Sequence, residues 1–172
     1  KLTQFEGGLR VPYVAKWPGH IAAGTQYKPA VSNIDILPTV LAAAGGTLPA
    51  DRLIDGVNLL PYLGKDGAVQ SPRALFWRDG PMRTIQEQGW KLTVAQRPRK
   101  DWLFDLNTDP TEKNNLAATQ PEKVARMKAA LEAHHAAMPA PLWPSFIELP
   151  IAIDKTLDQK MTPQDEYSYW YN

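Results

Sequence analysis

The chain has 172 residues, and its 19 lysines and arginines nearly balance its 18 aspartates and glutamates. A chain of this length is expected to form about one domain with its own hydrophobic core. The net charge of +1 provides no broad basic field for nucleic acid, so we expect no such partner. Cysteine is absent, which excludes disulfides, thiolate metal sites and a cysteine nucleophile within this chain. No apolar run approaches the roughly 18 residues that a bilayer-spanning helix needs, so we expect no membrane span.

The opening ten residues, KLTQFEGGLR, combine a flexible cation with an acid and two glycines. Gly7 and Gly8 permit positive φ and allow another group to approach the backbone closely. The ammonium of Lys1 is a point charge that suits a tetrahedral anion. Glu6 and Arg10 can brace the bend as an ion pair. Spacing alone leaves open whether this stretch is an anion site or a braced turn beside a solvated lysine.

A strand and a helix are predicted next. Residues 11–17, VPYVAKW, predict a strand that stops at a Pro-Gly turn. A helix is expected to begin after Asp35 as its N-cap, because Pro38 then falls in the first turn, and to end at Gly45. Its apolar residues share one face and are expected to be buried: Ile36, Leu37, Val40, Leu41 and Ala44. In the connector that follows, three leucines are expected to be buried: Leu59, Leu60 and Leu63.

Four short runs rich in aromatic and β-branched residues predict a β-meander. The runs are ALFWR, MRTIQE, WKLTV and DWLFDL, within residues 74–106. Pro121 can then open a helix at its first turn. An apolar stripe on this helix can cover one face of the sheet: Val124, Met127, Leu131 and Met138. A four-stranded antiparallel sheet packed by a carboxy-terminal helix is an α+β layout.

The last part of the chain is predicted to be an extended tail. Four prolines fall within the twelve residues that begin at Pro139, which excludes a helix or a central strand there. The tail closes on DEYSYWYN, whose four aromatic side chains are costly to leave in water. We therefore expect them to dock on the body of the protein or on a second copy, which makes the tail a candidate surface for a homo-oligomer.

Several motifs occur in the order and at the spacing seen in the carboxy-terminal part of arylsulfatases. They are KLTQFEGGLRVPYVAKWPGHIAAG, SNIDILPTVLAAAG, IDGVNLLPYL, WKL and LFDLNTDPTEKNNLA. Over about residues 1–135 the chain resembles this sulfatase family of the alkaline phosphatase superfamily, and the closing DEYSYWYN is similar to the tails of some bacterial arylsulfatases. The resemblance implies that residues 1–70 form the edge of a larger α/β catalytic domain, as a strand, a helix and a connector. Residues 71–138 then form the antiparallel sheet and helix, and residues 139–172 form the tail.

The resemblance also implies an activity, the hydrolysis of small-molecule or carbohydrate sulfate esters. In the family, the lysine of the pattern K-x-[ST]-x-x-E-G-G-x-R contacts the sulfate group of the substrate. Lys1 occupies that position, so it is the one catalytic and substrate-binding residue that the resemblance assigns to this chain. Glu6, Gly7, Gly8 and Arg10 are expected to support the site.

The remaining parts of the family's mechanism are not found in this sequence. Family members use a formylglycine nucleophile, made from the cysteine or serine of a C/S-x-P-x-R motif, and a calcium ion held by acids and an amide. No serine of the chain has a proline two positions later, and no paired-aspartate calcium motif appears, so we assign no metal ligand. We expect the chain to be a fragment that is inactive alone. An upstream segment of the same protein is expected to supply the nucleophile and calcium.

Two other hypotheses remain open. One is a phosphonate or phosphate ester hydrolase of the same superfamily, because a lysine beside a tetrahedral anion does not by itself distinguish sulfur from phosphorus. The other is a non-catalytic module that binds a partner through the aromatic tail. The sequence does not fix the compartment, for which the bacterial periplasm and the cytoplasm are the candidates.

Overall fold

The computed structural model describes residues 2–63, 73–156 and 158–171. The chain divides into two compact units, one formed by Lys1–Val11 with Ala74–Asn172 and the other by Pro12–Arg73. Within the described residues, no helix combines the length and the apolarity that crossing a bilayer requires.

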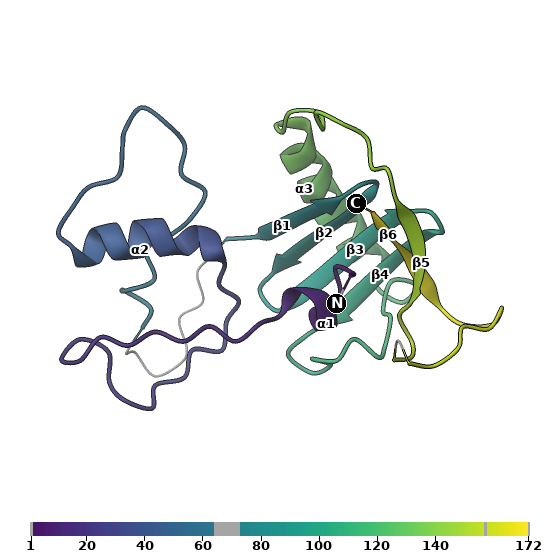
Figure 1. Ribbon diagram of the computed structural model, residues 1–172, viewed down its shortest axis with the longest axis horizontal. Helices are drawn as coiled ribbons and strands as arrows, with labels where there is room; N and C mark the ends of the chain where they lie inside the picture. The colour runs from purple at the N-terminus through teal and green to yellow at the C-terminus, as the bar shows by residue number, and fades with distance from the viewer. Residues whose placement is uncertain (1, 64–72, 157, 172) are drawn as a thin grey trace. The chain divides into compact units, whose positions relative to one another are not determined.

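The first unit is built on a four-stranded antiparallel sheet (Figure 1). Its strands are β1 (Leu75–Asp79), β2 (Met82–Glu87), β3 (Trp90–Gln96) and β4 (Arg99–Asp105), and they pair in chain order. Tight turns set this order: Gln88 and Gly89, between β2 and β3, have φ values of 48° and 80°. Two successive positive φ values are the type I′ geometry, whose twist matches the flanking strands. The predicted β-meander is confirmed.

Helix α3 (Pro121–Ala136) covers one face of this sheet (Figure 1). Pro121 stands in the first turn, as predicted, where its missing amide hydrogen is not needed. The side chains that form the core between helix and sheet are almost fully buried: Ile85, Leu92, Leu103, Val124, Met127 and Leu131. The prediction that Met138 joins this stripe is wrong, because Met138 lies beyond the helix end and is 47% exposed.

The opposite face of the sheet carries a second core. Since side chains alternate along a strand, the neighbours of the helix-facing residues point to this side. Its buried members come from the sheet, the opening segment and the end of the tail: Phe5, Met82, Ala95, Trp102, Phe104 and Tyr171. The opening segment and the tail therefore pack on the face that α3 does not cover.

The tail is more ordered than an extended segment. Strands β5 (Glu148–Ala152) and β6 (Tyr167–Tyr171) pair antiparallel, a hairpin that the sequence analysis did not predict within the extended tail. Pro150 lies within β5, a place that proline tolerates because this sheet has only two strands and both are edges. Tyr171 is 4% exposed and packs on Gly80, where an added Cβ would lie 2.6 Å from the tyrosine ring. The predicted docking of tail aromatics on the body is confirmed for this residue.

The second unit contains a short 3₁₀ helix, η1 (Asn33–Asp35), followed by α2 (Ile36–Ala43). Helix α2 begins after Asp35, which occupies the N-cap position as predicted, but the Asp35 side chain makes no capping hydrogen bond to α2. Asp35 ends the 3₁₀ turn, and its buried carboxylate accepts hydrogen bonds from the backbone N–H groups of Ser32 (2.8 Å) and Val57 (2.9 Å). The guanidinium of Arg73 forms an ion pair with the same carboxylate. Asp35 therefore joins three segments of this unit.

Two further predictions for the second unit are wrong. Residues 11–17 form no strand, and Val14 is 89% exposed. The apolar face of α2 is also largely exposed, with Leu37 at 57% and Val40 at 60%, whereas Pro38 is buried. The described part of this unit contains no sheet, so neither a partner strand nor a packing layer is available within it. Of the three leucines expected to be buried, Leu59 is buried and Leu60 and Leu63 are half-buried.

Candidate functional site

The candidate site is the opening segment, which lies on the sheet of the first unit (Figure 1). Lys1, the predicted sulfate-binding residue, lies outside the described residues. The anchoring begins three positions later at Gln4, whose side chain is buried and accepts a hydrogen bond of 2.7 Å from the Thr84 hydroxyl. The Thr93 hydroxyl lies 2.9 Å from that of Thr84. A short polar chain therefore links the opening segment to β2 and β3.

Phe5 provides the apolar part of this anchor. Its ring meets Trp102 edge-to-face at a centroid distance of 5.5 Å and Phe104 at 6.1 Å. Such edge-to-face contacts add a geometric preference to the burial of apolar area. Because Gln4 and Phe5 are consecutive, a polar and an apolar contact fix neighbouring backbone positions.

Helix α1 (Glu6–Leu9) follows and carries an ion triad formed by Glu6, Lys91 and Glu112. The Lys91 ammonium lies 2.9 Å from Glu6 Oε1 and 3.0 Å from Glu112 Oε1. The side chain of Lys91 has no exposed surface, and those of Glu6 and Glu112 are 13% and 5% exposed. The backbone N–H of Glu6 also donates a hydrogen bond of 2.5 Å to Glu112 Oε2. The triad thus holds both the side chain and the backbone of the first residue of α1.

Burial raises the pKa of the Glu112 carboxyl above its ordinary value, and the nearby Lys91 ammonium opposes this shift. Two carboxylates share one ammonium, so their mutual repulsion also acts in the raising direction. Glu112 has a φ of 56°, uncommon for a residue other than glycine. The carboxylate is therefore held in place against both a solvation cost and a backbone cost.

The two glycines differ in what they do. Neither has a positive φ, because both lie in α1. A Cβ at Gly8 would collide with the carbonyl oxygen of Thr3, whereas nothing lies within 4 Å of a Cβ at Gly7. Arg10 is exposed, and Glu6 pairs with Lys91 instead of Arg10. The close backbone approach expected of the glycines occurs at Gly8, and the supporting role predicted for Arg10 stays a prediction.

Sequence reasoning missed Lys91 and Glu112. Lys91 stands in the run WKLTV. Because side chains alternate along a strand, Lys91 lies on the same face of the sheet as Thr93, and Leu92 lies on the other face. A lysine at an inward-facing position of a central strand needs a buried anion as its partner. The inward-facing position of Lys91 was therefore the sequence pattern that could have revealed the ion triad. Glu112 gave no comparable indication, since its loop position does not fix where its side chain points.

A calcium site does not fit the described residues. No group of three or more histidine, aspartate or glutamate side chains converges as metal ligands among them. Asp109 accepts hydrogen bonds from the backbone N–H groups of Lys113 (3.0 Å) and Asn114 (2.8 Å), and Glu112 is committed to the triad. These two acids therefore order the loop before α3.

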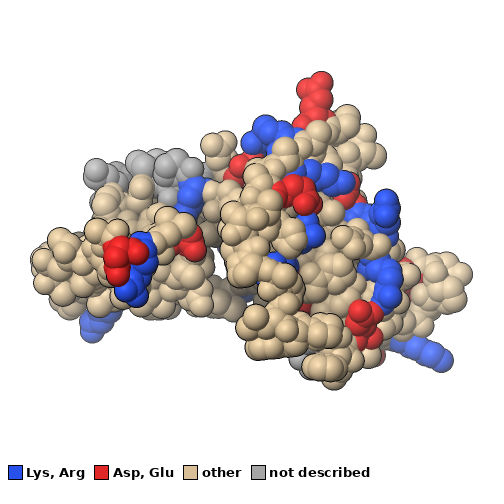
Figure 2. All heavy atoms as spheres, turned by 90° about the horizontal axis from the view of Figure 1, so that it is seen from above, with Lys and Arg blue, Asp and Glu red and all other residues tan. Residues whose placement is uncertain are grey.

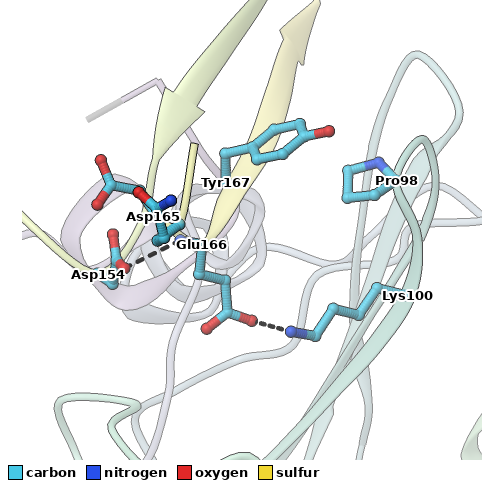
Figure 3. Close-up of a pocket in the computed structure, with 7 residues that line it drawn as sticks. Pro98, Lys100, Asp154, Asp165, Glu166 and Tyr167 are labelled. Carbon is cyan, nitrogen blue, oxygen red and sulfur yellow. Dashed lines mark hydrogen bonds and ion pairs between the residues drawn. The ribbon is translucent and has the colours of Figure 1, made fainter. Parts of the chain in front are cut away.

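A cavity of about 460 Å³ lies elsewhere in the first unit, between the β3–β4 turn and the start of β6 (Figure 3). Among its lining residues Lys100 forms an ion pair with Glu166, and Asp154 accepts a hydrogen bond of 2.9 Å from the Glu166 backbone N–H. Trp102 Nε1 donates to the same glutamate at 2.6 Å. These contacts of Glu166 link the tail to β4. On the molecular face in Figure 2, basic and acidic side chains are interspersed among a larger uncharged area.

Comparison with known proteins identifies the family. The family described as "N-sulphoglucosamine sulphohydrolase, C-terminal" matches residues 1–137, which include the opening segment, the whole sheet and α3. The chain belongs to this sulfatase family. It is 49% identical to human steryl-sulfatase over 120 residues, which are 69% of this chain and 20% of that protein. It is 51% identical to bovine arylsulfatase A over an alignment of 145 positions that covers 67% of this chain and 28% of that protein.

Solved structures agree with this sulfatase assignment. The structure of Ps i-CgsB matches 74% of this chain and 29% of its own, with a TM-score of 0.64 and 26% identity. The structure of BT4656 in complex with its substrate D-glucosamine-2-N,6-O-disulfate matches 70% of this chain and 27% of its own, with a TM-score of 0.55 and 26% identity. The chain thus spans between a fifth and three tenths of these relatives. The resemblance to arylsulfatases and the α+β fold are confirmed.

Proposed function

We propose that this chain is the carboxy-terminal part of an enzyme that hydrolyses sulfate esters, and that Lys1 contacts the sulfate group in the complete protein. The observation that carries the proposal is the anchored opening segment. In a chain of the sulfatase family, the three residues Gln4, Phe5 and Glu6 each bind the sheet by a different kind of contact. They stand three to five positions after Lys1 in the sequence.

This anchoring suits the chemistry of sulfuryl transfer. Like phosphoryl transfer, the reaction depends on positioning and on electrostatic stabilisation of oxygens around a tetrahedral centre. The ammonium of Lys1 serves both purposes if its backbone is held. Fixed donors stabilise developing charge without the reorganisation that solvent would need.

The other parts of the mechanism are assigned to an upstream segment of the same protein. In this proposal that segment supplies a formylglycine, whose hydrate is the nucleophile, and a calcium ion that polarises the sulfate oxygens. The residues described here do not fit a calcium site. The 172-residue chain alone is therefore proposed to be inactive.

The second unit supports the existence of such a partner segment. Its apolar side chains are exposed on α2 and on the segments around it: Tyr13, Val14, Ile36, Leu37, Val40, Leu48 and Leu53. Clusters of exposed apolar side chains mark surfaces that another protein segment covers. We propose that the upstream segment covers this surface.

The substrate class proposed is a small-molecule or carbohydrate sulfate ester. The relatives include steryl-sulfatase, arylsulfatase A and human N-acetylgalactosamine-6-sulfatase, and the substrate in the BT4656 complex is D-glucosamine-2-N,6-O-disulfate. These names span aryl, steryl and sugar esters, so they favour the sulfate group as the shared feature.

The test uses the full-length protein that contains this chain. Its turnover of an aryl sulfate is compared with that of the matching aryl phosphate and phosphonate, and a peptide map is searched for formylglycine. We expect sulfate turnover to dominate and the formylglycine peptide to be present. Preferential phosphate or phosphonate turnover would establish the alternative hydrolase, and no turnover with no formylglycine would favour a non-catalytic module.

A further inference from the structure

We propose that Lys91 is a positioning residue for sulfate binding: clamped between Glu6 and Glu112, its ammonium holds helix α1, and with it the described part of the opening segment, on the sheet. The inference rests on the proposed function, because it concerns the same site. Lys91 itself touches no substrate in this account. It acts through Glu6, which lies 85 residues earlier in the chain.

If Lys91 served only to pack the core, the desolvation of its buried ammonium would be an unnecessary cost in free energy. In the sheet, Lys91 pairs with Phe104 on β4 and with Gln86 on β2, on the face whose core holds Phe5 and Trp102. An apolar side chain of similar length would fill this place without burying a charge. Replacing buried ion pairs with apolar residues is often neutral or stabilising. The ammonium therefore requires a reason beyond stability.

We infer that the buried charge specifies the position of α1 on the sheet, which apolar contacts alone do not specify. Apolar contacts such as that of Phe5 with Trp102 tolerate small shifts, because burial energy has no preferred direction. The Lys91 ammonium donates a hydrogen bond of 2.9 Å to Glu6 Oε1 and lies 3.0 Å from Glu112 Oε1, and both contacts form only when Glu6 lies beside this buried pair. A buried polar group that fixes one arrangement among several is the best-attested use of such groups. Lys91 thus selects one register of α1 on the sheet.

The third member of the triad is set independently of α1. Glu112 lies in the loop after β4, and Asp109 orders this loop by capping the backbone N–H groups of Lys113 and Asn114. Glu112 then accepts the backbone N–H of Glu6 at 2.5 Å. Lys91 and Glu112 together form a fixed receptor, and Glu6 is the group that it holds.

The first experiment is a double-mutant cycle in the full-length enzyme, with Lys1→Ala and Lys91→Met assayed singly and together on an aryl sulfate. A displacement of about 1 Å at a site costs on the order of 10²-fold in rate, so we expect Lys91→Met to lower kcat/KM about 10- to 100-fold. In the Lys1→Ala background, the same substitution should cost about threefold or less, because residues that act as a unit are not additive. Full additivity would overturn the proposal, since a general loss of folded protein affects both backgrounds equally.

The controls separate positioning from stability. Arg83→Met removes another ion pair of the same sheet, that with Glu132 at 2.8 Å on the helix side, and should leave kcat/KM unchanged. Lys91→Arg retains the charge and should recover part of the activity. Should Lys91→Met not fold, Glu6→Gln removes the same link while leaving a hydrogen-bond acceptor, and the same non-additivity with Lys1→Ala is expected of it.

The second experiment reads the anchoring without any substrate. Hydrogen–deuterium exchange of the full-length protein is compared among wild type, Lys91→Met, Glu6→Gln and Arg83→Met. We expect amides of residues 4–9 to exchange at least about tenfold faster in the first two variants, while amides of β2 and β3 keep their protection. Unchanged exchange at residues 4–9 would overturn the inference, whichever ester the enzyme turns over. Absence of sulfate turnover in wild type would instead refute the proposed function.

Discussion

The buried ammonium of Lys91 lies 2.9 Å from Glu6 and 3.0 Å from Glu112, so one cation of the sheet joins the start of α1 to the loop before α3. These three residues are far apart in sequence and meet only through the fold. Their arrangement leads to predictions on the stability of the opening segment, its pH dependence and its part in catalysis.

Replacement of Gly8 should destabilise the opening segment. A Cβ at this position collides with the Thr3 carbonyl oxygen, and overpacking of this kind costs about 1–3 kcal/mol. Gly7→Ala is the matched control, because nothing lies within 4 Å of its Cβ and alanine favours a helix. Denaturant unfolding should show a loss for Gly8→Ala and none for Gly7→Ala. Equal effects of the two substitutions would show that the close approach at Gly8 is not present.

Phe5 should contribute strongly to stability. Its truncation to alanine removes a buried ring from the cluster with Trp102 and Phe104, and large-to-small changes of this kind cost about 3–5 kcal/mol. The control is Phe146→Ala, whose ring is 84% exposed and whose loss should cost less than about 0.5 kcal/mol. Thermal unfolding measures both. A Phe5→Ala protein as stable as Phe146→Ala would mean that the opening segment is not docked.

The free energy of unfolding should depend on pH through Glu112. Its pKa is raised in the folded protein by burial, against the opposing ammonium of Lys91 and with the added repulsion of Glu6. The folded state therefore binds this proton more tightly than the unfolded state does. The contribution of Glu112 to the free energy of unfolding is therefore complete at pH values below the pKa of the unfolded state, near 4.5. This contribution is lost as the pH rises through the higher pKa of the folded state.

The measurement for Glu112 is a pair of denaturation series, wild type and Glu112→Gln, from pH 4 upward. We expect the stability of wild type to fall relative to that of Glu112→Gln over this window, because glutamine does not ionise. Parallel curves would show that Glu112 titrates normally in the folded protein.

Asp35 should be essential to the second unit. Its buried carboxylate accepts from Ser32 and Val57 and pairs with Arg73, so Asp35→Ala leaves a buried cation without its partner. Breaking a buried pair costs about 3–5 kcal/mol. Hydrogen exchange at the Val57 amide should rise sharply in this variant. Asp51→Ala, which removes an exposed pair with Arg52, should leave exchange at Val57 as it is in wild type, and any comparable rise there would contradict the assignment.

The four-stranded sheet and the helix that covers it could be predicted from the sequence. The four strands follow from β-branched and aromatic runs between tight turns, and α3 follows from Pro121 and its apolar stripe; these are local patterns. The strand at residues 11–17 and the burial of α2 were mispredicted, because both depend on a surface that the described second unit does not provide. The hairpin of β5 and β6 was missed because the prolines near it argued against a central strand and indicated only an extended tail.

The candidate site was predictable only in part. Lys1 and the glycines follow from the resemblance to sulfatases, while the interaction of Glu6 with Arg10 was a guess from spacing that the fold replaced with Lys91. Long-range ion pairs leave no trace in local periodicity, and only the inward position of Lys91 on a central strand pointed to one. A buried cation inside a predicted sheet is therefore a reason to search for a distant carboxylate.

The central claim is tested most directly by the aryl sulfate kcat/KM of the full-length enzyme with and without Lys1→Ala. Loss of one donor to a developing oxyanion typically costs on the order of 10² to 10³ in rate, and we predict a loss of this size with the unfolding temperature unchanged. Near-normal turnover in the Lys1→Ala enzyme would contradict the account, because the anchored opening segment would then hold no group that acts on sulfate.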